Sequence, residues 1–149
     1  MGKIPNLWKW FTTSRNLKAL SAVGTILVIV IVGLWVDYNY AQSQSDAAAL
    51  QRSLKIREKA LGPEHHDVAA SLNNLAALYR EQGHYAEAKP LWQRALQIFE
   101  KALGPYHPYV ATCLENYATL LRKMGGEGEA GPLESRAKAI RAKHAQENL

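Results

Sequence analysis

The chain has 149 residues, of which 48% are hydrophobic and 21% charged, and its formal net charge is +5. This length suits one small domain with an appendage, and the hydrophobic content excludes a disordered chain. A single cysteine excludes an internal disulfide and a cysteine-rich zinc site. Residues 1–18 carry four basic residues and no acid, whereas residues 37–149 carry 14 basic residues against all 13 acids. The basicity belongs to the N-terminal tail, so nucleic acid is not an expected partner.

An apolar segment follows this tail. Residues 19–36 contain no charge and would span about 27 Å as a helix, which is close to the hydrocarbon thickness of a bilayer. An isolated strand would leave its backbone groups unpaired in lipid, so a helix is predicted. Aromatic residues flank the segment on both sides, as at membrane interfaces: Trp8, Trp10, Phe11, Trp35, Tyr38 and Tyr40. We therefore predict a transmembrane helix at residues 19–38, in contact with the lipid bilayer.

The charges predict the orientation of this single-pass protein. The basic tail favours a cytoplasmic N-terminus, with the remainder outside the cytoplasm, in the periplasm if the source is bacterial. A buried core helix is disfavoured, because a domain this small cannot cover a helix that is apolar on every side. A cleaved signal peptide, with cleavage after Ala41 or Ala47, remains an alternative because the basic start fits one. The apolar run is longer than usual for such a peptide, which favours a retained anchor.

The C-terminal two thirds of the chain contains an internal repeat. Ala60-Leu61-Gly62-Pro63 returns 42 residues later as Ala102-Leu103-Gly104-Pro105, and about half of the positions in 60–101 are identical in 102–143. Beyond a polar linker at 39–48, the pattern predicts a half repeat at 49–61, repeat one at 62–103 and repeat two at 104–145. Two and a half repeats make a marginal core, which favours stabilisation by a partner or by self-association.

Each repeat is predicted to form two helices. Apolar residues at helical spacing follow residue 67, Gly83 ends the first helix, and a second apolar face begins near Tyr85. Repeat two departs from this pattern, since Glu127 replaces Tyr85 and Glu134 replaces Trp92. Such polar replacements suit either a terminal cap that faces water or a partly frayed repeat.

At this point the repeats resemble a known family. The segment at residues 66–79 resembles tetratricopeptide repeats of the 42-residue kind found in kinesin light chains. The small residues of that family also match here, at Ala76, Ala88, Ala95, Ala118, Ala130 and Ala137. The resemblance covers residues 49–145. It implies an all-α fold of about five helices, in which a transmembrane helix precedes a short solenoid of helix pairs. It also implies binding of proteins or peptides rather than catalysis.

In that family the first helix of each pair lines the concave surface. Transferred here, the resemblance implies these groove positions: Asn73, Asn74, Ala77, Arg80, Glu115, Asn116, Thr119 and Arg122. The asparagines would bond to a partner's backbone and the arginines to an acidic or carboxylate group. The alternative is that these residues are only soluble helix surface. A chaperone-type clamp would need lysine and asparagine where Asn73 and Ala77 stand, so a chaperone tail is not the expected ligand.

Comparison of the two repeats argues against the other candidate functional sites. Glu64-His65-His66-Asp67 has metal-binding residue types, but its second copy is Tyr106-His107-Pro108-Tyr109, so a structural corner is favoured. Cys113 replaces Ser71 in register and is interpreted as a packing residue. The basic residues of the last helix are interpreted as a solvated face: Arg136, Lys138, Arg141 and Lys143. No phosphate loop or catalytic triad is recognisable, so no enzyme, metal or cofactor is predicted.

The sequence thus predicts a membrane-tethered scaffold or adaptor that binds a protein or peptide through the groove. The alternative is an accessory structural subunit of a larger membrane complex, held through its transmembrane helix. The two differ in where the affinity lies, in the groove or in the lipid-embedded helix.

Overall fold

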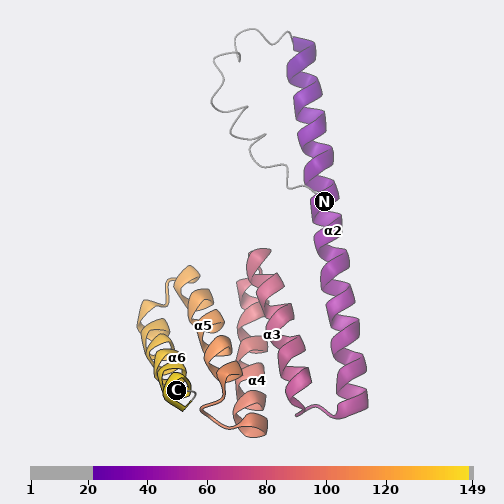
Figure 1. The fold of residues 1–149 in the computed structure, drawn as a ribbon. Coiled ribbons are helices and arrows are strands. Elements are labelled where there is room, and N and C mark those ends of the chain that lie inside the picture. Colours follow the sequence, from indigo (N-terminus) through magenta and orange to yellow (C-terminus); the bar gives the residue numbers. More distant parts are fainter. Residues whose placement is uncertain (1–21, 148–149) are drawn as a thin grey trace. The chain divides into compact units, whose positions relative to one another are not determined.

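A computed structural model describes residues 22–147 (Figure 1). It contains α2 (Ala22–Leu61), α3 (His66–Glu81), α4 (Tyr85–Leu103), α5 (Pro108–Lys123) and α6 (Glu127–Glu147). Within residues 22–147 there is no strand, so the predicted all-α fold is confirmed. The basic tail at 1–18 and the beginning of the predicted transmembrane segment at 19–38 lie outside the described residues.

The chain divides into two units, Met1–Gln42 and Ser43–Leu149, and α2 runs through the boundary. Residues 39–48, expected to be a linker, are helical. The cause is local, because no glycine or proline occurs between residues 34 and 61 and three successive alanines occupy 47–49. A polar composition alone therefore did not mark a break.

The described part of the first unit carries an exposed apolar surface. Ile29 is 70% exposed, and Leu34 and Trp35 are exposed to a similar degree. Among the helices of residues 22–147, only α2 is long and apolar enough to cross a membrane by length and composition. A continuous apolar surface of this kind is typical of a segment that contacts lipid or another protein.

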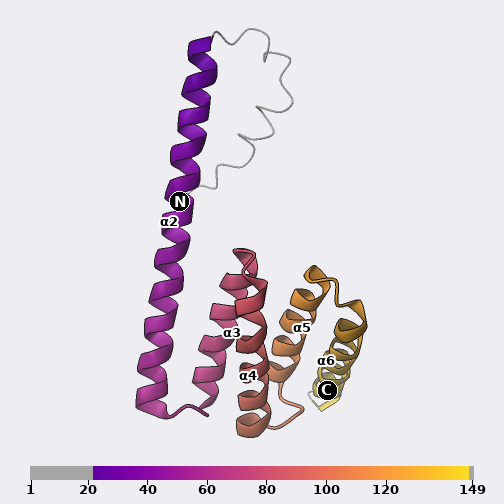
Figure 2. The same ribbon diagram turned by 180° about the vertical axis from the view of Figure 1, so that it is seen from behind.

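In the second unit, α3 to α6 stand side by side (Figures 1 and 2). α3 packs against α4, α5 against α6, and α4 joins the two pairs. The core residues recur at the 42-residue shift, and the buried pairs are Val68 and Val110, Leu72 and Leu114, Ala76 and Ala118, Ala88 and Ala130, Ala95 and Ala137, and Ile98 and Ile140. The alanines allow close approach of neighbouring helices, so each repeat buries the same apolar face.

Two ion pairs repeat with the same period. Glu58 of α2 pairs with Arg94 of α4 at 2.7 Å, and Glu100 of α4 pairs with Arg136 of α6 at 2.6 Å. All four side chains are part-exposed, so each pair contributes at most about 1 kcal/mol to stability. These two ion pairs join equivalent positions one repeat apart. The C-terminal part of α2 therefore contacts α4 through the same pair of positions by which α4 contacts α6.

The corners between repeats use a histidine as the helix N-cap. Nδ1 of His65 accepts a hydrogen bond from the backbone N–H of Asp67, and Nδ1 of His107 accepts one from Tyr109, both at 3.2 Å. Each cap satisfies a backbone donor that the first helical turn leaves unpaired. The preceding helices end at glycines with a positive φ, 89° at both Gly62 and Gly104.

The last helix is continuous despite its polar sequence. α6 buries Ala130, Ala137 and Ile140 against the core, and most of its other side chains are exposed. The continuous helix and its buried face argue against a frayed repeat two.

Candidate protein-binding groove

The first helices of the two repeats meet through their asparagines. Nδ2 of Asn116 on α5 donates a hydrogen bond to Oδ1 of Asn73 on α3 at 3.2 Å. The same oxygen accepts a hydrogen bond from Nε1 of the fully buried Trp92 on α4 at 2.8 Å. Asn73 therefore joins three helices. Asn73 was predicted to contact a partner in the groove. In the structure its side chain instead connects helices of the domain through two hydrogen bonds.

The neighbouring groove positions are less engaged. Asn74 is exposed, and no hydrogen bond joins its side chain to another residue in 22–147. Ala77 is half-buried against the core. Of the predicted row formed by Asn74 and Asn116, only the Asn74 amide group has both its donor and its acceptor available to a partner.

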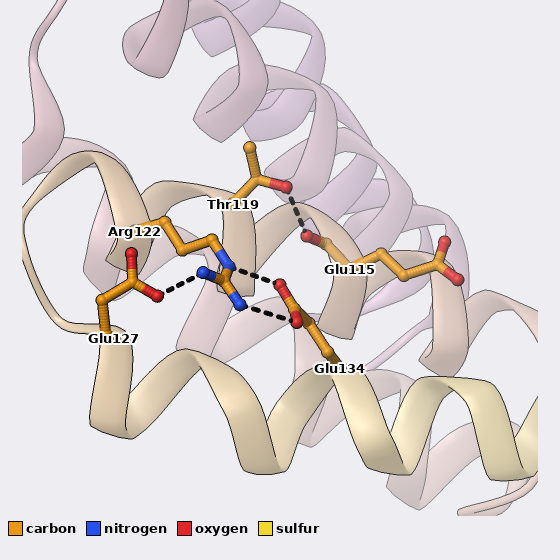
Figure 3. Close-up of polar contacts among 5 residues, drawn as sticks. All are labelled: Glu115, Thr119, Arg122, Glu127 and Glu134. Atoms are coloured by element: carbon orange, nitrogen blue, oxygen red, sulfur yellow. Dashed lines mark hydrogen bonds and ion pairs between the residues drawn. The ribbon is translucent and has the colours of Figure 1, made fainter.

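On α5, Glu115 is paired with the last helix. Its two carboxylate oxygens accept hydrogen bonds from Nε and Nη2 of Arg141, both at 2.6 Å. These bonds lower the pKa of Glu115 and raise that of Arg141. Thr119 Oγ1 donates to the backbone oxygen of Glu115 at 2.8 Å (Figure 3). Both side chains thus have partners within the domain.

Arg122 is held by two carboxylates of α6 (Figure 3). Its Nε and Nη2 donate to Glu134 at 2.7 and 3.0 Å, and its Nη1 donates to Glu127. The hydrogen bond to Glu134, with the negative charges of Glu127 and Glu134, raises the pKa of Arg122, and the same bond lowers the pKa of Glu134. Arg122 was predicted to bind a ligand. In the structure its guanidinium is instead bonded to two carboxylates of the same domain.

Arg80, the counterpart of Arg122 in repeat one, has a different environment. Its guanidinium carbon lies 5.5 Å from the centroid of the Trp92 ring. Its one ion pair within residues 22–147 is with Glu81 at 3.9 Å, and no hydrogen bond links its guanidinium to the described residues. The side chain is only 19% exposed. Where Arg122 meets two glutamates, Arg80 meets an aromatic ring.

Arg80 lines an open depression of about 580 Å³ between the C-terminal part of α3 and α5. Its lining residues are Arg80, Glu81, Gln82, Gly83, Tyr85, Thr119 and Lys123. Sequence reasoning named Arg80 and Thr119 but missed Tyr85 and Lys123. A signal was present, because Lys123 stands where repeat one has Glu81, a reversal of charge at the 42-residue shift. Within the described part of the chain Lys123 forms no ion pair.

The histidine corner and the cysteine both have structural explanations. Donor atoms of His65, His66 and Asp67 lie within 4.8 Å of one another. Nδ1 of His65, however, serves as the helix cap, and His107 does the same in repeat two without such neighbours. Cys113 is buried, and burial, with the charge of Glu100, raises the pKa of its thiol to about 12. A thiol in this state is a poor nucleophile.

Comparison with known proteins agrees with this geometry. The tetratricopeptide repeat profile matches residues 38–67 and 68–109, just under half of the chain. A stretch of 44 residues, 30% of this chain, is 48% identical to part of nephrocystin-3 from Xenopus laevis, and the same holds for nephrocystin-3 from Xenopus tropicalis. The chain covers only 3% of the length of these two relatives.

The matched residues end at 109, although α5 and α6 repeat the core positions of α3 and α4. Tetratricopeptide repeats are in general a protein-interaction fold without catalytic activity, and their partners are proteins. This chain therefore carries tetratricopeptide repeats in a helical solenoid.

Proposed function

We propose that this chain is a membrane-tethered interaction module that binds a protein or peptide through the surface shared by α3 and α5. One observation carries the proposal: the hydrogen bond between Asn73 and Asn116 joins the first helices of both repeats into one polar surface. Asn74 and Thr119 are exposed on these two helices. An extended peptide has a donor and an acceptor on every residue, which side-chain amides can match. The 42-residue period supports a relationship to the kinesin light chain type of repeat.

The tether is the apolar part of α2. Its exposed side chains between Ile26 and Val36 support insertion in a bilayer, and the basic residues of 1–18 support a cytoplasmic N-terminus. The repeats would then lie outside the cytoplasm, in the periplasm of a bacterium.

Protease added to sealed, right-side-out vesicles tests this orientation. We expect digestion of the repeats, whereas protection until detergent is added would show the reverse topology. A mature chain that begins near Gln42 or Ala48 would show that the apolar segment is cleaved.

The exposed apolar surface of α2 also supports a second candidate, an accessory subunit held in a membrane complex. Crosslinking in native membranes, followed by identification of the attached proteins, separates the two. An adaptor loses its partner when Asn74 and Asn116 are both replaced by alanine. An accessory subunit keeps its partners in that variant and loses them when residues 19–38 are exchanged for a foreign transmembrane sequence.

A further inference from the structure

We propose that the depression at Arg80 receives an aspartate or glutamate side chain of the bound peptide. This inference rests on the proposed function and specifies the chemistry of the partner. The observation behind it is the contrast between Arg80 and Arg122, which occupy the same position in two copies of one repeat.

Repeat two supplies an internal template. There the guanidinium of Arg122 takes both carboxylate oxygens of Glu134, and Glu127 adds a third bond. Paired N–H···O bonds of this kind give arginine its selectivity for carboxylates. In repeat one the same two positions hold Trp92 and Tyr85, which have no carboxylate to offer.

The contacts of Arg80 leave its donors for a ligand. The Trp92 ring attracts the positive charge of the guanidinium but uses none of its five N–H groups. Glu81, at 3.9 Å, is beyond hydrogen-bonding distance. Among the described residues no side-chain nitrogen or oxygen is both buried and unbonded, so the unbonded guanidinium nitrogens of Arg80 are accessible, and Arg80 lines the depression. A carboxylate bound there can accept hydrogen bonds from them.

The rest of the lining favours an anion. Lys123 adds a second positive charge without an ion-pair partner in residues 22–147, and Glu81 is the single acid. Gln82 already donates a hydrogen bond from Nε2 to the backbone oxygen of Ser43 at 3.0 Å. The surface is open and is lined by α3, the α3–α4 turn, the start of α4 and α5, so a peptide chain can pass across it while one acidic side chain enters.

The test uses the full-length protein in lipid nanodiscs and a library of random dodecapeptides with amidated C-termini. We expect the selected peptides to contain aspartate or glutamate. Replacing that residue by its amide should weaken binding about 10- to 100-fold, the range for one charge-assisted contact. Arg80→Gln should weaken binding equally, and the two changes together should add little more. The matched control Arg122→Gln should leave affinity unchanged.

A second pair of variants leaves Arg80 in place. Tyr85→Glu puts a carboxylate where repeat two has Glu127, so it should compete for Arg80 and weaken binding of the acidic peptide. Tyr85→Gln removes the same ring without adding a charge and should weaken binding much less. Equal effects of the two variants would contradict competition for the guanidinium.

The outcomes separate this inference from the proposed function. If peptides bind but neither the amide replacement nor Arg80→Gln weakens them, the carboxylate inference is wrong and the interaction module stands. If no amidated peptide binds, but the same library made with free C-terminal carboxylates does, the choice of a side chain is wrong. If no peptide binds the wild type better than a Leu75→Asp variant with a disrupted core, the proposal that the groove binds peptides is wrong, and so is the carboxylate inference that rests on it.

Discussion

The Asn73 side-chain oxygen accepts a hydrogen bond from the indole nitrogen of Trp92, and both positions are acidic in repeat two. Glu115 stands in the place of Asn73, and Glu134 in the place of Trp92. Each of these acids is paired with its own arginine, Glu115 with Arg141 and Glu134 with Arg122. One repeat thus closes its helix pair with a neutral hydrogen bond and the other with two ion pairs.

Adjacent asparagines should therefore differ in their effect on stability. Asn73→Ala leaves the buried indole N–H of Trp92 without an acceptor, so we expect a loss of about 1–3 kcal/mol in the free energy of unfolding. Asn74→Ala removes no bond and places a better helix former in α3, so the change should be close to zero. Urea unfolding followed by circular dichroism measures both. Similar losses in the two variants would contradict the structural part assigned to Asn73.

The corner histidines should matter as caps. His107→Ala removes the acceptor for the Tyr109 amide and should cost about 0.5–2 kcal/mol, whereas His107→Ser should retain most of the stability. His84 is the matched control because it occupies the N-cap of α4 without a side-chain cap bond, so His84→Ala should change little. Thermal unfolding of the three variants tests this. An effect at His84 as large as at His107 would exclude capping as the cause.

Acid should weaken repeat two. The pKa values of Glu115 and Glu134 are lowered by their arginine partners, so the folded state binds fewer protons at these groups than the unfolded chain. Their stabilisation is present above the unfolded pKa, about 4.3, and is lost as the pH falls through the folded values. Unfolding measured between about pH 6 and pH 3 should show this loss.

Two substitutions identify the source of that pH dependence. Glu115→Gln and Glu134→Gln together should flatten the dependence of stability on pH. Glu87→Gln is the control, since Glu87 is exposed and forms no ion pair within residues 22–147. An unchanged acid dependence in the double variant would place its origin elsewhere.

Cys113 should be unreactive in the folded protein. Its pKa of about 12 and its burial keep it a protonated, inaccessible thiol at pH 8. We expect very slow reaction with Ellman's reagent in native buffer and rapid reaction in denaturant. In a Cys113→Ala background, Ser135→Cys supplies an exposed thiol on α6 for comparison. Equal native rates for the two thiols would show that α5 opens readily.

The sequence predicted the helices well because each repeat marks its own boundaries. Gly83 ends α3 as expected, and Tyr85 begins α4 as expected. The predicted linker at 39–48 lies inside α2, since its polar residues contain no helix breaker. The different environments of Arg80 and Arg122 could not be predicted, although the sequence shows that Glu127 in repeat two replaces Tyr85 of repeat one. Only the packing of α6 on α5 shows that the new glutamates reach Arg122.

The glycine corners have a consequence for the length of this protein. Positive φ values of 89°, 80°, 89° and 80° recur at Gly62, Gly83, Gly104 and Gly125, a spacing of 21 residues. The chain thus turns at equal intervals, and residues 62–103 form a cassette whose two ends match. A duplicate cassette spliced between Leu103 and Gly104 would add one more Glu–Arg rung and one more Asn–Trp pair, while both ends of the solenoid keep their neighbours. Such a domain can therefore lengthen only in steps of 42 residues, and each added cassette leaves the residues at both ends of the solenoid unchanged.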